Sequence, residues 1–321
     1  MKRRIIKQGH NTMTITLPIN WIKKFNLNPG NEIDLIERDD GIFLSPEKVN
    51  GKPKRVEIDI SGKDIPTIWK YFMGVYREGY DEVLVKFDPE TQIEYPHKFY
   101  VKHIRDFREK CPIEKKCISE VIQHFVARFI GFEIMEHGKN FILIKEMGEI
   151  TNKEFDNSLR RVFLLVQQMA EEVTEAINTG DIKTLQHIQD VDINLDKFHD
   201  YCIRILKKTH DNRSKKDCLY FSTLYILELL GDELKNIGLH LINDFQRTKF
   251  KANVKKIAEL VKEEFDHYYE LFYKFDEEKL NRLSQIDKET YMNVPEMYRK
   301  ADEPEKEIFH HLRMIGRYLN A

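Results

Sequence analysis

Two pairs of acidic residues, each with a spacing of four, carry the clearest chemical signal in the sequence. Asp192 and Asp196 form the first pair, and Glu228 and Asp232 form the second. Residues four apart lie on the same face of an α-helix, one turn above the other. Carboxylate oxygens bind hard and borderline metal ions. The four residues are therefore candidate metal ligands, provided that two helices bring the pairs together.

The helix expected to carry the second pair has its central stretch at residues 225–243. Its leucines and isoleucines recur with helical spacing, and Glu228 and Asp232 border that apolar face. Gly231 lowers the helix propensity by about 1 kcal/mol, so we expect another element to pack closely against it. Removing a carboxylate from water is costly unless a cation compensates. This position therefore favours a partnered role for the two acids.

Acidic pairs at this spacing also occur by chance, because the chain has 54 acidic residues among 321. Most such pairs lie on solvated helix faces, and we assign Asp200 to that class. The two pairs above differ because both border the apolar stripes of neighbouring helices. The nearby histidines are treated as surface or packing residues rather than as ligands; they are His187, His199 and His240.

The last part of the chain, residues 151–321, has helical periodicity throughout. Six helices in two groups of three indicate two antiparallel bundles, at residues 151–247 and 248–321. The two groups also show an internal repeat, in which Gly180-Asp181 aligns with Phe275-Asp276. The expected helices are approximately 153–179, 181–210, 215–246, 250–275, 277–293 and 303–320.

The stretch Asp192-Ile-Asn-Leu-Asp196-Lys-Phe, together with Glu228-x-x-Gly-Asp232-x-x-x-Asn236, resembles the PhoU family of phosphate-signalling regulators. The resemblance spans about residues 153–320. It implies two three-helix bundles in which acid-x-x-x-Asp pairs of neighbouring helices bind clustered metal ions such as iron or zinc. The metal ligands implied by this resemblance are Asp192, Asp196, Glu228 and Asp232.

The second bundle departs from this pattern. Alignment of the two repeats places Asp287 at the position of Asp192, but Tyr291, Arg313 and Arg317 at the positions of the other three acids. We therefore expect no metal cluster in the second bundle. The two arginines either form internal ion pairs, which we favour, or make an anion site, since guanidinium groups suit phosphate.

Residues 1–50 have a different character. The segment before Glu32 contains six basic residues and no acidic residue. We expect an alternating strand at residues 13–17, a short helix after Pro18 and a tight hairpin at Asp40-Gly41. Elements this short cannot bury a sufficient core in one chain, so we expect a second copy to complete it.

This segment resembles the AbrB/MazE/SpoVT family of swapped-hairpin DNA-binding domains over residues 3–47. The resemblance is carried by Leu17-Pro18 before the helix and by Leu27-x-Pro29-Gly30-x-Glu32-Ile33 after it. It implies a homodimer whose interleaved hairpins close a small β-barrel with basic groups facing DNA. The residues nominated on this basis, flanking phosphate contacts included, are Lys2, Arg3, Arg4, Lys7, Asn11, Lys23 and Lys24.

Residues 51–150 carry no catalytic motif that we recognise. Apolar alternation and helical spacing predict an α+β domain with at least four strands, serving as a spacer or an oligomerisation element. The expected strands are 55–60, 82–87, 132–136 and 141–145, and the expected helices are 65–78 and 117–129.

The composition limits the class of protein. A net charge of −2 means that any nucleic-acid surface must be local. Four cysteines without a signal peptide indicate reduced thiols in a cytoplasmic protein, and Cys111 and Cys117 lack a usual zinc spacing. No apolar run approaches the roughly 18 residues that a membrane span needs.

The expected fold is a mostly α multidomain protein with a swapped-hairpin β-barrel at 1–50, an α+β domain at 51–150 and a PhoU-like helical domain at 151–321. The resemblances imply a homodimeric transcriptional regulator of phosphate uptake that binds promoter DNA and senses its effector through a helical domain that binds iron or zinc. The alternatives are a protein-interaction regulator of a phosphate transporter and an antitoxin-like dimer without DNA binding. A di-metal carboxylate enzyme needs Glu-x-x-His pairs on bundle helices, and we do not expect the chain to be such an enzyme.

Overall fold

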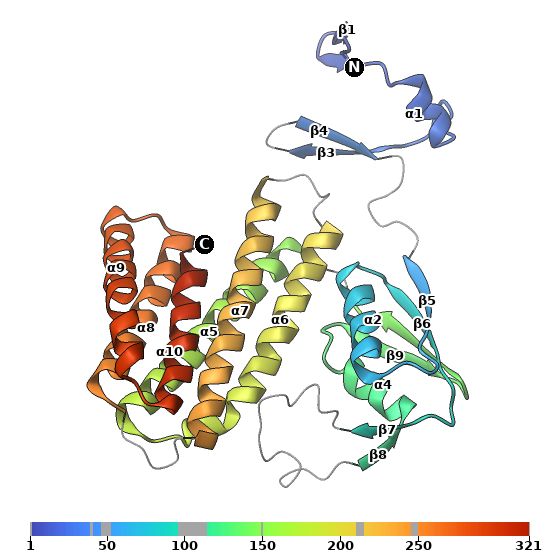
Figure 1. The fold of residues 1–321 in the computed structure, drawn as a ribbon. Helices are drawn as coiled ribbons and strands as arrows, with labels where there is room; N and C mark the ends of the chain where they lie inside the picture. The colour runs from blue at the N-terminus through green and yellow to red at the C-terminus, as the bar shows by residue number, and fades with distance from the viewer. Residues whose placement is uncertain are drawn as a thin grey trace. The chain divides into compact units, whose positions relative to one another are not determined.

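A computed structural model of the chain describes residues 2–38, 41–45, 53–95, 114–148, 150–209, 215–244 and 250–320. The chain divides into two compact units, Met1–Lys54 and Arg55–Ala321. The larger unit holds an α+β domain and a helical domain, each with its own hydrophobic core (Figure 1). Two residues named above, Asp40 and Cys111, lie outside the described residues.

The described residues of the N-terminal unit form two hairpins and one short helix. Its strands pair antiparallel as β1 with β2 and as β3 with β4. These are two separate two-stranded sheets, so the described residues of one chain contain no closed barrel. The predicted barrel requires the hairpins of two chains, and the two short hairpins of one chain cannot enclose a core. The bounds are β1 (Ile6–Gln8), β2 (Thr12–Thr14), α1 (Ile19–Lys24), β3 (Asp34–Arg38) and β4 (Gly41–Ser45).

The α+β domain is built on a four-stranded sheet with the strand order β5-β6-β10-β9. Strands β5 and β6 are parallel and are connected by α2, whereas β10 is antiparallel to both of its neighbours. An additional antiparallel pair, β7 with β8, was not expected from the sequence. The bounds are β5 (Arg55–Asp59), α2 (Ile65–Arg77), β6 (Glu82–Lys86), β7 (Gln92–Tyr95), β8 (Glu114–Cys117), α4 (Ile118–Val126), β9 (Phe132–His137) and β10 (Phe141–Glu146).

Aromatic side chains pack helices α2 and α4 of this domain against each other. Trp69 and Phe72 of α2 contact Phe125 of α4, with ring centroids 5.2 and 5.7 Å apart. Tyr76 is fully buried, and its hydroxyl donates a hydrogen bond of 2.7 Å to the carbonyl oxygen of Ile130. Buried aromatic pairs of this kind add to the stabilisation from area burial. The apolar stripe of α2 therefore lies against α4 and the sheet.

The C-terminal part is helical, as the periodicity predicts. Helices α5, α6 and α7 contact one another, and so do α8, α9 and α10. Contacts of α5 with α8 and of α7 with α10 join the two groups, and their buried residues form one continuous core. The bounds are α5 (Asn152–Thr179), α6 (Ile188–Thr209), α7 (Lys215–Asp244), α8 (Ala252–Tyr273), α9 (Glu277–Lys300) and α10 (Glu303–Leu319).

Local signals in the sequence account for most of these helix ends. Thr151 and Glu154 form a reciprocal capping box at the start of α5, and Gly180 adopts the left-handed conformation (φ 77°) that ends it. Helix α9 continues past Pro295 to Lys300, although we expected it to end near residue 293. A proline removes one helical hydrogen bond, and the burial of Val294 against the core compensates for that loss.

The close packing expected at Gly231 is confirmed. A methyl group on Gly231 would lie 2.0 Å from Cδ2 of Leu195, so α6 and α7 approach closely at this point. Gly231 therefore brings together the two helices that carry the acidic pairs. In the part of the chain that the structure describes, no helix combines the length and the apolarity needed to cross a membrane.

Candidate functional site

The DNA-binding candidates all lie in the N-terminal unit, and all are exposed. Lys7 is in β1 opposite Met13 of β2, and Asn11 lies in the turn between the two strands. None of the basic candidates forms an ion pair with another described residue, so their charges remain available to phosphate groups. The other candidates precede β1 or end α1; they are Lys2, Arg3, Arg4, Lys23 and Lys24.

The same unit also exposes apolar side chains. Ile6 is 52 % exposed, Leu35 is 62 % exposed and Ile42 is 64 % exposed. Among the described residues of this unit none is buried. A chain this short cannot enclose a core alone, and contiguous exposed apolar surface usually marks an interaction site. In a single chain these apolar side chains therefore stay in contact with solvent.

In the first bundle, Asp192 and Asp232 come together around Lys235. The Nζ atom of Lys235 lies 2.9 Å from Oδ2 of Asp192 and also donates to Asp232. Asp192 is 7 % exposed, and burial raises its pKa although Lys235 opposes the shift. Burial alone would lower the pKa of Lys235, but the two carboxylates outweigh it and raise it. Lys235 thus lies between two of the predicted metal ligands.

The other two predicted ligands flank this pair. Arg128, which follows α4 in the α+β domain, donates from Nη2 to Oδ2 of Asp196 over 2.8 Å. Burial and then the charge of Asp192 raise the pKa of Asp196 to about 8. Burial and then the charge of Asp232 raise the pKa of Glu228. Both pKa values rise because burial and a neighbouring carboxylate disfavour the ionised form.

The four carboxylates are not gathered closely around one point. Within the described residues their oxygens do not form a group of three ligand atoms within 4.8 Å of one another. Lys235 binds two of them and Arg128 binds a third, so cations of the protein hold the positions a metal ion would take. Metal binding by these four residues stays a prediction, and it requires Lys235 to withdraw.

Helix α6 turns a stripe of charged residues toward the α+β domain. Asp196, Asp200, Arg204 and Lys208 are spaced by four and therefore share one face. Asp200 is 4 % exposed and accepts a hydrogen bond of 2.7 Å from Nε of Arg77. Its assignment to a solvated face was therefore wrong. The four-residue spacing is visible in the sequence. The partners of these charged residues belong to the α+β domain, and a local sequence pattern does not identify partners in another domain.

Arg204 anchors this contact between domains. Its side chain is fully buried, and Nη1 and Nη2 donate to the carbonyl oxygens of Tyr76 and Tyr80 over 2.6 and 2.7 Å. Its Nε donates to Oε1 of Glu146 over 2.8 Å, and its guanidinium lies 4.7 Å from the ring centroid of Phe132. A buried guanidinium that uses this many donors fixes the register between α6 and the α+β domain.

Three of the four repeat positions of the second bundle line a cavity of about 350 Å³. Arg313, Arg317 and Asp287 all border this cavity, and neither arginine forms an ion pair with a described residue. Glu264 borders it as well and is fully buried; burial and then the charge of Asp287 raise its pKa to about 8. Asn320 donates to Oε1 of Glu264 over 2.8 Å. Of the two expected roles of the arginines, internal ion pairing is not seen among the described residues.

Two Glu-x-x-His pairs occur on the bundle helices, at Glu264–His267 and Glu307–His310. The spacing that a di-metal carboxylate enzyme requires is thus present, so the spacing alone does not argue against such an enzyme. Within the described residues, the structure does not bring these two pairs into one group of ligand atoms.

One comparison identifies part of the chain. Residues 6–52 match a family model described as "Antidote-toxin recognition MazE, bacterial antitoxin". The match falls within the N-terminal unit and gives the chain a MazE-like domain there. A comparison with curated proteins finds no match.

Proposed function

We propose that this chain is a cytoplasmic DNA-binding regulator that acts as a homodimer through its N-terminal unit. The MazE-like domain is the observation that carries the proposal. Two features of the unit support it: basic residues without intramolecular ion-pair partners among the described residues, and apolar side chains that one chain leaves exposed. The exposed apolar residues account for dimerisation, and the basic residues account for DNA binding.

In this proposal the second copy completes the core. The two hairpins of one chain form separate sheets, so each has unpaired strand edges that a second copy can pair. Interleaving the hairpins of two chains would cover Leu35 and Ile42 and close the barrel. Dimerisation also places two sets of six basic residues in one domain, which suits binding to the phosphate backbone.

We further propose that the helical domain is a PhoU-like sensor and that the DNA targets are promoters of phosphate-uptake genes. The spacing of Asp192, Asp196, Glu228 and Asp232 motivates this part of the proposal. The contacts that Asp196, Asp200 and Arg204 make with the α+β domain support a relay, since a change at α6 would reach that domain directly. Binding experiments with phosphate and with metal ions would identify the effector.

An antitoxin-like or transporter-binding regulator is the second candidate function. The exposed apolar surface of the N-terminal unit favours it, because the same surface could bind a partner protein. The description of the matching family model also concerns recognition of a toxin. In this case the dimer forms, but its basic face does not bind DNA.

Titration of genomic DNA fragments with the full-length protein at several salt concentrations tests the proposal. Replacing Arg3, Arg4 and Lys7 by Ala removes up to six phosphate-binding side chains from a dimer. The slope of log affinity against log salt should flatten by roughly 0.9 for each DNA phosphate that the variant no longer neutralises. The measurement is repeated with phosphate, iron and zinc to detect an effector.

A matched control removes the same charge from the larger unit. Lys70, Lys139 and Arg299 are exposed there, and their replacement by Ala should leave the salt slope unchanged. If the N-terminal variant and this control give equal slopes, the basic face does not bind DNA. If the protein is dimeric but binds no DNA fragment at low salt, the result favours the protein-interaction candidate.

A further inference from the structure

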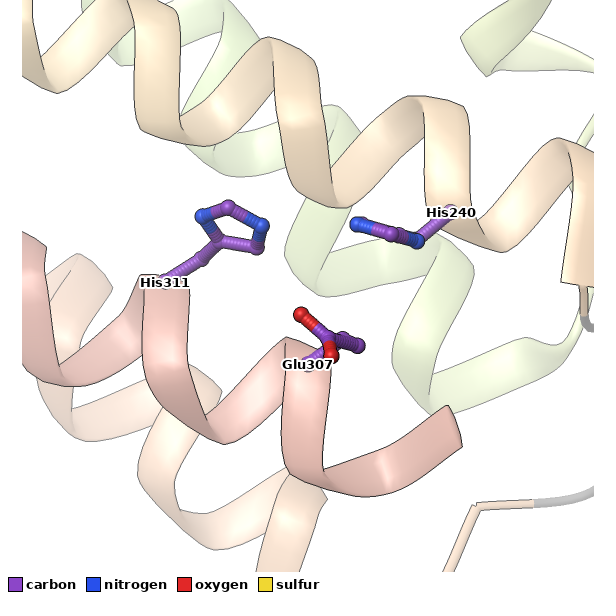
Figure 2. A group of neighbouring side chains, drawn as sticks. All are labelled: His240, Glu307 and His311. Carbon is purple, nitrogen blue, oxygen red and sulfur yellow. The ribbon is translucent and has the colours of Figure 1, made fainter. Parts of the chain in front are cut away.

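Helices α7 and α10 bring two histidines and a glutamate together. His240 lies on α7, and Glu307 and His311 lie on α10. One ligand atom from each lies within 4.8 Å of the other two. Figure 2 shows the two imidazole rings and the carboxylate turned toward one shared space. None of these residues belongs to the acidic pairs of the first bundle.

The sequence places these side chains by simple helical geometry. Glu307 and His311 are four residues apart, so they share one face of α10. That face meets α7, because α7 and α10 pack against each other. The Glu307 side chain forms no hydrogen bond or ion pair with another described residue. Its carboxylate is therefore a ready ligand beside the two imidazoles.

Glu233 supplies the second observation. Its Oε2 lies 2.5 Å from Nδ1 of His311, and both side chains are largely buried. An imidazole that donates Nδ1–H to a carboxylate presents Nε2 as a more basic ligand in a fixed orientation. In Figure 2 the ring of His311 is directed toward His240 and Glu307. The arrangement is that of a carboxylate–histidine pair orienting a metal ligand.

We propose that His240, Glu307 and His311 bind a divalent transition-metal ion, with zinc as the best match, and that Glu233 positions His311. Two imidazole nitrogens and one carboxylate oxygen are a known ligand set for zinc. Bonds of about 2.0 Å to a tetrahedral ion bring ligand atoms to roughly 3.4 Å from one another. Because the Glu307 side chain is exposed, its carboxylate can move closer to the two imidazoles by rotation of its side-chain bonds.

The ion would tie the two bundles together. His240 comes from the first group of helices and the other two ligands from the second. Binding would therefore stabilise the contact between α7 and α10. This consequence separates the site from the acidic pairs, which lie between α6 and α7.

Metal titration of the chelator-treated full-length protein tests the proposal. Zinc uptake is measured by elemental analysis and by competition with a chromophoric chelator, and cobalt absorption reports imidazole coordination. The variant His240→Ala/His311→Ala should lose one bound equivalent. Glu233→Gln should lower the affinity 10- to 100-fold, as expected for a residue that positions a ligand. The d–d absorption of the bound cobalt should disappear with the double variant.

Two controls make the result decisive. His310 is exposed and adjacent in sequence, and His310→Ala should keep the wild-type stoichiometry. Asp192→Asn/Asp232→Asn should also keep the equivalent bound by the histidines. Circular dichroism establishes folding, and His240→Gln/His311→Gln replaces the alanine variant if that variant unfolds. Unchanged uptake in a folded double variant, or an equal loss in His310→Ala, overturns the proposal.

Discussion

The guanidinium of Arg128 donates from Nη2 to Oδ2 of Asp196 over 2.8 Å, and this bond joins the α+β domain to the helical domain. Asp196 was expected to bind a metal ion inside the first bundle. Its carboxylate also belongs to the stripe on α6 that includes Asp200 and Arg204. The charged face of α6 therefore connects two domains.

A double-mutant cycle between Arg128→Ala and Asp196→Asn should give a coupling free energy of about 1 kcal/mol. The pair is partly exposed, so solvent screening reduces its contribution. The free energy of unfolding in urea measures it. The exposed pair Lys300 and Glu296 is the control, and its coupling should be below about 0.5 kcal/mol. Equal coupling energies for the two pairs would contradict a specific interdomain contact at Asp196.

Arg204→Met should lower the free energy of unfolding by roughly 3 to 5 kcal/mol. The substitution removes the guanidinium donors from the carbonyl groups of Tyr76 and Tyr80 and removes a buried partner of Glu146. Urea unfolding measures the loss, and limited proteolysis shows whether the α+β domain separates from α6. Lys207→Ala breaks only a partly exposed pair with Glu78 and should change stability by less than about 1 kcal/mol.

Lys235→Met removes the ammonium group between Asp192 and Asp232. The protein should lose roughly 2 to 4 kcal/mol of stability at pH 7.5, because Asp192 is left as a buried charge without its partner. Burial holds the folded pKa of Asp192 above its unfolded value, so stability should rise as the pH falls and the carboxyl binds a proton. Urea unfolding at pH 5.5 and 7.5 checks both effects.

The same variant tests the metal prediction for the first bundle. With Lys235 gone, iron or zinc should bind Asp192, Asp196, Glu228 and Asp232 and restore stability, by about 2.7 kcal/mol at a hundredfold excess over Kd. The control Lys262→Met removes the ion-pair partner of Asp266 on α8. In this control neither iron nor zinc should increase the free energy of unfolding. If Lys235→Met gains no stability from either metal, the four carboxylates are not metal ligands.

Glu264→Gln should change the pH dependence of stability. Burial raises the folded pKa of Glu264 to about 8, so between about pH 4.5 and 8 the folded state binds more protons than the unfolded state. Stability is then lost as the pH rises through this window, by up to about 1.4 kcal/mol per pH unit. The variant should lose the contribution of Glu264 and therefore show a shallower slope than the wild type in melts between pH 5 and 8. Glu296→Gln should keep the wild-type slope, because Lys300 lowers the pKa of Glu296.

The N-terminal unit should fold only as a dimer. The melting temperature of residues 1–54 should rise with protein concentration, because association and folding are linked. In the full-length chain, Ile42→Asp should convert the dimer to a monomer in sedimentation experiments. Leu219 is equally exposed but lies on α7, and Leu219→Asp should leave the dimer intact. A monomeric wild-type chain would contradict the swapped-hairpin proposal.

Local sequence patterns determined most of the secondary structure. The capping box at Thr151, the left-handed Gly180 and the apolar spacing of α7 each act within a few residues, so the sequence alone identified the helices. The turn and proline spacing of the N-terminal segment likewise identified a domain type that the MazE match supports. Gly231 also indicated a close helix contact, because a glycine inside a strong helix needs a packing reason.

The tertiary structure decided which groups neutralise the acidic residues. Lys235 was close in sequence to Asp232, but its contact with Asp192 required α6 and α7 to pack at Gly231. Arg77 and Arg128 reach α6 from another domain, and His240 reaches α10 from another bundle. The free energy of a buried charge depends on every neighbour within a few ångströms. Helical spacing places a charge on a face, but only the fold determines what that face meets.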